Sequence, residues 1–326
     1  MSLRLCHRPA LKRLLALCLL AQANLVHSGA EARGVGNYYF KIAQASTEAD
    51  RGFDNNGNGA PLASDVFLDD FTAGFARDGE YREKAYRIYL EYGVTERIDL
   101  LFSLEYKDIK ETFETVPKGV ELPFQTRVTR EADGLADGMV GFKYQLKDTA
   151  FPIATDVRFV FPNYSTSVSH LNLETIDSSD DKVPLGDGTY NLEFGLGASV
   201  YPIPWTFADA RAAFVLSDID GREFSDKVRW ELKAGGSYKG PGGAVFADGA
   251  ISLNNGDAPN TISQDSLTID PKNRVTVLND QEFTRLGLQG WYYFNGVSLE
   301  ATLSKVINGR NTTKDTSFEI AISFQQ

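Results

Sequence analysis

Cysteine, histidine and methionine are scarce in this chain of 326 residues, which contains two, three and two of them. Both cysteines, two of the histidines and Met1 lie within the first 30 residues. From residue 31 onwards there is no cysteine, which excludes disulfide bonds, thiolate nucleophiles and thiolate metal sites in that part. Only His170 and Met139 remain of the other two residue types.

Positive charge is also in short supply. The chain has 33 Lys and Arg against 44 Asp and Glu, a formal net charge of −11. Four of the basic residues and none of the acidic ones lie in the first 30 residues, so the remainder has 29 basic residues against 44 acidic ones, a charge of −15. Binding to nucleic acid requires a basic surface. The charge balance therefore argues against nucleic acid as a partner.

Long apolar runs are missing as well, so no segment after residue 30 could form a membrane-spanning helix. Residues 1–30 have the order of a secretory signal peptide: a basic start, the short apolar run LLALCLL, and then small residues. We expect cleavage near Ala30 or Ala32, because small residues stand three positions back, at Ser28 and Ala30. Residues 31–326 would then be one exported domain. An anchor helix is disfavoured by the short run, and a lipoprotein is disfavoured by Leu17 before Cys18.

Alternation of apolar and polar residues is the dominant pattern after residue 30. Between Tyr86 and Tyr106 an apolar residue recurs at every second position of each half, and charged residues such as Arg87, Glu91 and Glu105 stand between them. This alternation is typical of β-strands with two unlike faces. It recurs along the chain and predicts about twelve strands, at residues 36–46, 84–92, 97–108, 138–147, 151–161, 189–200, 205–217, 227–239, 243–254, 284–294, 296–306 and 315–325.

The connections between these strands alternate in length. The short ones are GVTE, KDTAFP, YPIP, KGPGG and FNG, which contain turn residues. The long polar ones are residues 47–83, 109–137, 162–188, 218–226, 255–283 and 307–314. Transmembrane β-barrels have short periplasmic turns and long external loops. The even number of strands places both chain ends on the periplasmic side.

Aromatic residues gather at the predicted periplasmic ends of the strands, as in an interfacial girdle. They are Tyr92, Tyr144, Tyr201, Tyr238, Tyr292, Phe294 and Phe324. The sequence therefore predicts an all-β fold, a transmembrane up-and-down antiparallel β-barrel in a bacterial outer membrane. Its expected partners are outer-membrane lipid, lipopolysaccharide and, through the aromatic-ended last strand, the barrel-assembly machinery. The alternative is a soluble barrel or sandwich with the apolar face inside.

Four segments resemble the outer-membrane barrel family labelled "MetA-pathway of phenol degradation". They are YLEYGVTERIDLLFSLEY, GLADGMVGFKYQL, NLEFGLGASVYP and SKVINGRNTTKDTSFEIAISF. The family has an acidic-Tyr-Gly turn before a strand and a GRNT loop before the last strand. The resemblance covers most of the chain after the signal peptide. It implies a barrel of roughly twelve strands that transports small hydrophobic or aromatic compounds and has no catalytic residues.

Charged residues on the non-apolar face are the candidates for lining the lumen. They are Arg87, Glu91, Asp99, Glu105, Lys107, Lys143, Asp156, Arg158, Glu193, Asp209, Arg211, Arg229, Glu231, Lys233, Asp248, Arg285, Glu300 and Glu319. Their signs are mixed, which favours a polar channel of low charge selectivity, because a selective pore uses a ring of one sign. A lumen filled by salt-bridged side chains is the alternative, since barrel size alone does not decide between them.

Two loop motifs provide further candidates. Asp54, Asn56, Asn58 and Asp65 have the spacing of ligands in a calcium-binding loop, with Asp in place of the final Glu; a Gly- and Asn-rich turn would give the same pattern. His170, with serines nearby, is the only residue on which a rim enzyme could be built; a solvated loop histidine is the simpler interpretation. We therefore expect a channel without cofactor and without enzymatic activity.

Overall fold

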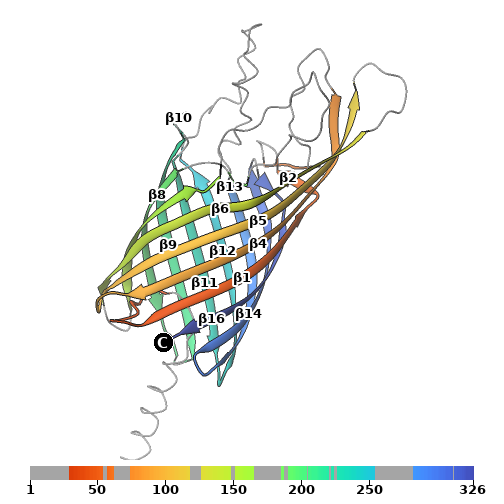
Figure 1. Ribbon diagram of the computed structural model, residues 1–326. Helices are drawn as coiled ribbons and strands as arrows, with labels where there is room; N and C mark the ends of the chain where they lie inside the picture. Colours follow the sequence, from red (N-terminus) through yellow and green to blue (C-terminus); the bar gives the residue numbers. More distant parts are fainter. Residues whose placement is uncertain are drawn as a thin grey trace, which may run out of the picture.

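The computed structural model describes residues 29–53, 57–61, 74–117, 126–147, 151–164, 185–186, 190–203, 205–219, 222–223, 226–253, 282–310 and 312–326. Within these residues, twelve antiparallel strands form one closed barrel (Figure 1). Each strand pairs with the next along the chain, and β1 pairs with β16 to close the barrel. The strands are β1 (Tyr38–Ala49), β4 (Gly74–Gly93), β5 (Ile98–Pro117), β6 (Thr126–Lys147), β7 (Ile153–Pro162), β8 (Tyr190–Val200), β9 (Thr206–Ile219), β11 (Lys227–Ser237), β12 (Pro241–Ser252), β13 (Glu282–Phe294), β14 (Val297–Arg310) and β16 (Thr316–Gln325).

Four short strands complete the description. β2 (Arg51–Phe53), β3 (Gly59–Pro61) and β15 (Thr312–Thr313) form a small separate sheet, and β10 (Arg222–Glu223) pairs with the end of β9. They belong to the side of the barrel at which the sequence places its long connections. Among the described residues, no helix has the length and apolarity needed to cross a membrane.

The apolar face of the barrel points outward. Val245, Leu288 and Leu299 are 57%, 59% and 60% exposed, whereas Glu91 and Asp99 are 2% and 0% exposed. A continuous exposed apolar surface of this kind is stable in lipid and not in water, and closure pairs every strand edge inside the bilayer. The prediction of an outer-membrane β-barrel is therefore confirmed, and the soluble alternative, with the apolar face inside, is wrong.

Tight turns join the strands at one end of the barrel, as predicted. One example is the two-residue turn Asn295–Gly296 between β13 and β14, in which both residues have positive φ angles of 49° and 82°. Turns of this type match the twist of the flanking strands and favour Asn-Gly. The end of β16 lies at the same end of the barrel, where Gln326 donates a hydrogen bond to the carbonyl of Tyr38. This end is the periplasmic one in an outer-membrane barrel.

Strands β4, β5 and β6 are longer than the sequence indicates. They contain 20, 20 and 22 residues and include positions 74–83, 109–117 and 126–137, which were predicted to be loop. Figure 1 shows them extending past the rim of the barrel. Here side chains such as Lys110 and Glu131, which form an ion pair, are exposed. Polar residues stand even at buried positions of this part, such as Glu83 and Thr112. The apolar period is therefore lost although the hydrogen-bonded ladder continues, so this part of the prediction was wrong.

The aromatic girdle is present with one correction. Tyr238, Tyr292 and Phe294 are well exposed on the outer face of the periplasmic end. Trp205, which the sequence analysis did not include, is exposed beside Tyr238, with ring centroids 6.4 Å apart. Tyr201 instead packs against the buried cluster of Phe207, Ala244 and Trp291. Tyr201 lies in a turn and, unlike the other aromatic residues of the girdle, does not fall on the outward-facing positions of the alternation. This accounts for its inward placement.

Candidate functional site

The interior of the barrel contains a cavity of about 350 Å³. Its wall consists of alternate residues of the strands, because side chains on a strand point to opposite faces in turn. Among the predicted lumen residues, those that line it are Arg87, Glu91, Lys143, Asp156, Arg158, Asp209, Arg211, Glu231, Lys233, Glu300 and Glu319. The remaining candidates form ion pairs with charged residues of the same face: Asp99 with Lys143, Glu105 with Arg87, Lys107 with Glu105, Glu193 with Arg211, Arg229 with Glu193, and Arg285 with Asp248.

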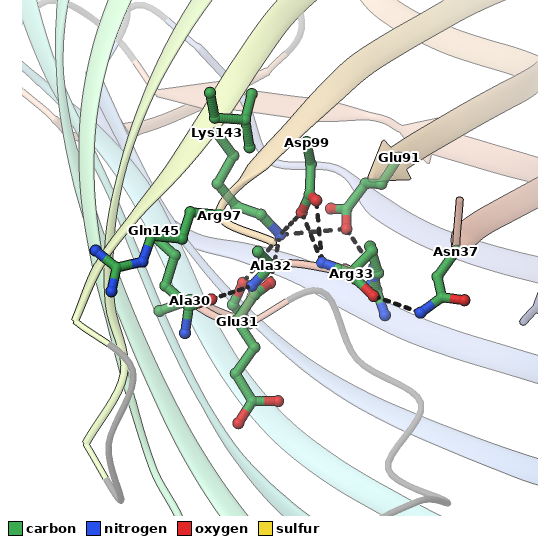
Figure 2. Close-up of polar contacts among 12 residues, drawn as sticks. Ala30, Glu31, Ala32, Arg33, Asn37, Glu91, Arg97, Asp99, Lys143 and Gln145 are labelled. Carbon is green, nitrogen blue, oxygen red and sulfur yellow. Dashed lines mark hydrogen bonds and ion pairs between the residues drawn. The ribbon is translucent and has the colours of Figure 1, made fainter. Parts of the chain in front are cut away.

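A buried cluster of charges lies towards the periplasmic end, where β4, β5 and β6 meet (Figure 2). Lys143 Nζ is 3.0 Å from Asp99 Oδ2 and 3.3 Å from Glu91 Oε2. Arg33 Nε, from the segment before β1, is 2.8 Å from Glu91 Oε2. Tyr89 donates a hydrogen bond of 2.6 Å to the other Glu91 oxygen. We call Arg33, Glu91, Asp99 and Lys143 the Asp99 cluster; its opposite charges compensate one another inside the barrel.

A second cluster spans the seam where β1 pairs with β16. Lys41 Nζ is 2.8 Å from Glu319 Oε1 and 3.4 Å from Glu300 Oε2. Arg87 continues the chain of contacts, with Nη1 3.2 Å from Glu319 Oε2 and Nε 2.6 Å from Glu105 Oε1. Positive and negative groups thus alternate across neighbouring strands of the wall. Each basic side chain thereby compensates the negative charge of the carboxylates next to it inside the barrel.

A third cluster is centred on Asp156 of β7. Arg211 binds both carboxylate oxygens, at 2.6 and 2.9 Å, and Arg158 Nε lies 2.7 Å from Oδ1. Arg211 also lies 3.6 Å from Glu193, which in turn pairs with Arg229. Bidentate arginine–carboxylate contacts are among the stronger polar contacts in proteins and fix the orientation of both side chains. This part of the wall is therefore rigid.

Two charged groups on β11 differ from these clusters. Glu231 and Lys233 line the same cavity, yet neither has an ion pair within 4 Å among the described residues. Lys233 Nζ lies 5.9 Å from the centroid of the Phe207 ring, a contact of cation–π type. Glu231 is exposed to the lumen. These two groups therefore differ from the charged groups of the three clusters, which are held by ion pairs.

Several lumen residues were missed by the sequence analysis. Lys41, Tyr39 and Tyr89 all line the cavity. Each stands on the inward parity of a predicted strand, so the same alternation could have identified them. Arg33 had no such signal, because it lies before the first strand, next to the residues at which signal cleavage was expected.

The other predicted sites are outside the part of the chain that the structure describes. Asp54, Asn56, Asp65 and His170 belong to the residues that are not described, and of the calcium motif only Asn58 is included. No group of three or more metal-binding side chains occurs among the described residues. The calcium site and the rim enzyme therefore remain untested.

No family model matches the chain in sequence, and no curated protein does. Solved structures match it in fold. The structure of the COG4313 outer membrane channel from Pseudomonas putida F1 has a TM-score of 0.62 at 12% identity, over 93% of this chain and 100% of that one. The NanC porin has a TM-score of 0.44 at 10% identity, over 87% and 100%. At 12% identity the likeness to the COG4313 channel supports the barrel fold alone, and the resemblance to the MetA-labelled family stays a prediction.

Proposed function

We propose that this chain is a passive outer-membrane channel for small solutes. The observation that carries the proposal is the polar cavity inside a closed barrel, with Glu231 and Lys233 facing it unpaired among the described residues. A channel needs groups that interact with a solute strongly enough to admit it and weakly enough to release it. The similarity in fold to a protein described as an outer membrane channel supports the proposal.

For the solute, we propose small hydrophobic or aromatic compounds. The resemblance to the MetA-labelled family implies this class. Tyr89, which lines the cavity and is partly exposed, supports this class. Aromatic side chains offer flat apolar faces on which a planar ring can stack. As partners we propose outer-membrane lipid and lipopolysaccharide at the exposed apolar belt, and the barrel-assembly machinery at β16.

A second candidate function is a closed barrel with a structural or surface-binding role. The three charge clusters favour it, because side chains locked in ion pairs could fill the lumen. The rim enzyme built on His170 remains a further alternative; replacing His170 by Ala would abolish an enzymatic activity and leave transport unchanged.

Swelling of proteoliposomes distinguishes these functions. We suggest benzenesulfonate and methanesulfonate as a matched pair of solutes, since both carry one permanent negative charge and cross lipid poorly. The channel proposal predicts swelling with both, and the aromatic proposal predicts that benzenesulfonate enters faster than its larger size would allow. Swelling without this preference would refute the aromatic class alone. No swelling, from protein shown to be folded and inserted, would favour the closed barrel.

A further inference from the structure

A short segment before β1, Gly29–Arg33, is bound inside the periplasmic end of the barrel (Figure 2). It is not part of any strand, yet Gly29 and Ala30 form part of the cavity wall. Its backbone amides donate hydrogen bonds to side chains of three strands or their ends. These bonds run from Ala30 to Ser199 Oγ (2.9 Å), from Ala32 to Gln145 Oε1 (2.9 Å), and from Arg33 to both oxygens of Asp99 (3.0 and 3.2 Å).

The carbonyl groups of the segment are bound as well. Lys143 Nζ donates to the carbonyl oxygen of Glu31 at 2.8 Å and lies 3.5 Å from that of Gly29. Asn37 donates to the carbonyl oxygen of Arg33 at 2.8 Å. With the ion pair between Arg33 and Glu91, almost every residue of the segment is held by the barrel.

The side chains that receive the segment are buried polar groups. Ser199, Asp99, Gln145 and Lys143 are 1%, 0%, 5% and 6% exposed. A buried polar group is costly unless it is hydrogen bonded, and each of these four has a partner in the segment. The segment thus supplies hydrogen-bond partners to four buried polar groups at this place in the wall.

This arrangement bears on where the signal peptide is removed. Cleavage after Ala30 or Ala32 would discard residues that make these contacts. The tripeptide Ala21-Gln22-Ala23 directly follows the apolar run and has small residues at both positions that a signal peptidase requires. We propose that cleavage occurs between Ala23 and Asn24, and that the retained segment Gly29–Arg33 acts as a plug that narrows the periplasmic mouth. The proposed site differs from the sites expected from the sequence, which are near Ala30 and Ala32.

The retention of the segment is tested by intact-mass spectrometry of the protein purified from outer membranes. The proposal predicts a mature chain that begins at Asn24. A mass corresponding to a start at Glu31 or Arg33 would overturn it. Because this measurement does not depend on transport, it separates a failure of this inference from a failure of the proposed channel function.

The role of the segment as a plug rests on the proposed function and is tested by single-channel conductance. The double variant Ser199→Ala, Gln145→Ala removes two acceptors for the segment without changing charge. Ser304→Ala is the matched control, a buried serine on β14 with no contact to the segment among the described residues. We expect the double variant to raise the conductance by about twofold or more, since the constriction limits flow, while the control leaves it unchanged. Equal conductance of wild type and double variant would overturn the plug.

Discussion

Lys143 on β6 and Lys233 on β11 line the same cavity in opposite surroundings. Lys143 lies within 3.3 Å of two buried carboxylates, those of Glu91 and Asp99. Lys233 has no ion pair within 4 Å among the described residues; it stands opposite Asp209 of β9 in the sheet, and its Nζ lies 5.9 Å from the centroid of the Phe207 ring. Both lysines stand on the inward face of a strand, so alternation treats them alike. The difference shows that Lys143 is held in the wall by ion pairs and Lys233 is not. Under the proposed function, Lys233 is therefore available to solutes.

Removal of Lys143 should have the largest effect on stability. Lys143→Met leaves two buried carboxylates with fewer compensating charges, and breaking a buried ion pair costs about 3–5 kcal/mol. Lys233→Met should cost less, about 0.5–2 kcal/mol of the free energy of unfolding, because it loses the cation–π contact with Phe207 but no ion pair. Urea unfolding in lipid vesicles, followed by tryptophan fluorescence, measures both. Equal losses for the two variants would contradict the comparison.

Arg211→Met tests a cluster in which the carboxylate of Asp156 has a second basic partner, Arg158. Asp156 would lose both hydrogen bonds from Arg211 but keep Arg158 at 2.7 Å. We expect a loss of about 1.5–3 kcal/mol, the usual range for hydrogen bonds to a charged group. The double variant Arg211→Met, Asp156→Asn should recover part of the loss in the same unfolding assay. If the double variant recovered none of the lost free energy of unfolding, Arg211 would not stabilise the barrel by compensating the charge of Asp156.

On the β11 side, the expected effect is on transport. Lys233→Gln removes an unpaired positive charge from a wet lumen, worth about 1 kcal/mol of attraction for an anion. Uptake of benzenesulfonate by proteoliposomes should fall by roughly fivefold, and Glu231→Gln should raise it. Arg82→Gln, an exposed change on β4, is the control. If benzenesulfonate uptake fell equally in Arg82→Gln and in Lys233→Gln, Lys233 would not lie on the route of the solute.

The smallest effect is expected for the ion pair between Lys110 and Glu131, beyond the rim of the barrel. Both side chains are at least half exposed, so water screens their attraction. Lys110→Ala should cost about 0–1 kcal/mol. A loss as large as that of Lys143→Met in the same unfolding assay would show that burial does not account for the difference between the two lysines.

Alternation in the sequence was sufficient to predict strands with two unlike faces and their number, because both follow from the period of two. The outward direction of the apolar face was predicted from the alternating loop lengths and the aromatic girdle. It could not predict contacts between strands, since these depend on register. Lys41 meets Glu319 only because β1 closes onto β16, nearly 280 residues away in sequence. The lengths of β4–β6 were missed because polar residues stand at buried as well as exposed positions of their extensions, as at Glu83 and Thr112. The role of Arg33 was missed because a segment outside the strands has no periodicity to follow.

The central claim is that solutes pass the unpaired charges of β11, and the reversal potential across a planar bilayer tests it most directly. The folded protein would be inserted with a KCl gradient across the membrane, and wild type compared with Lys233→Glu. The account predicts stepwise conductance for both and a shift of the reversal potential towards cation selectivity in the variant. Silent membranes containing inserted protein, or identical reversal potentials, would contradict it.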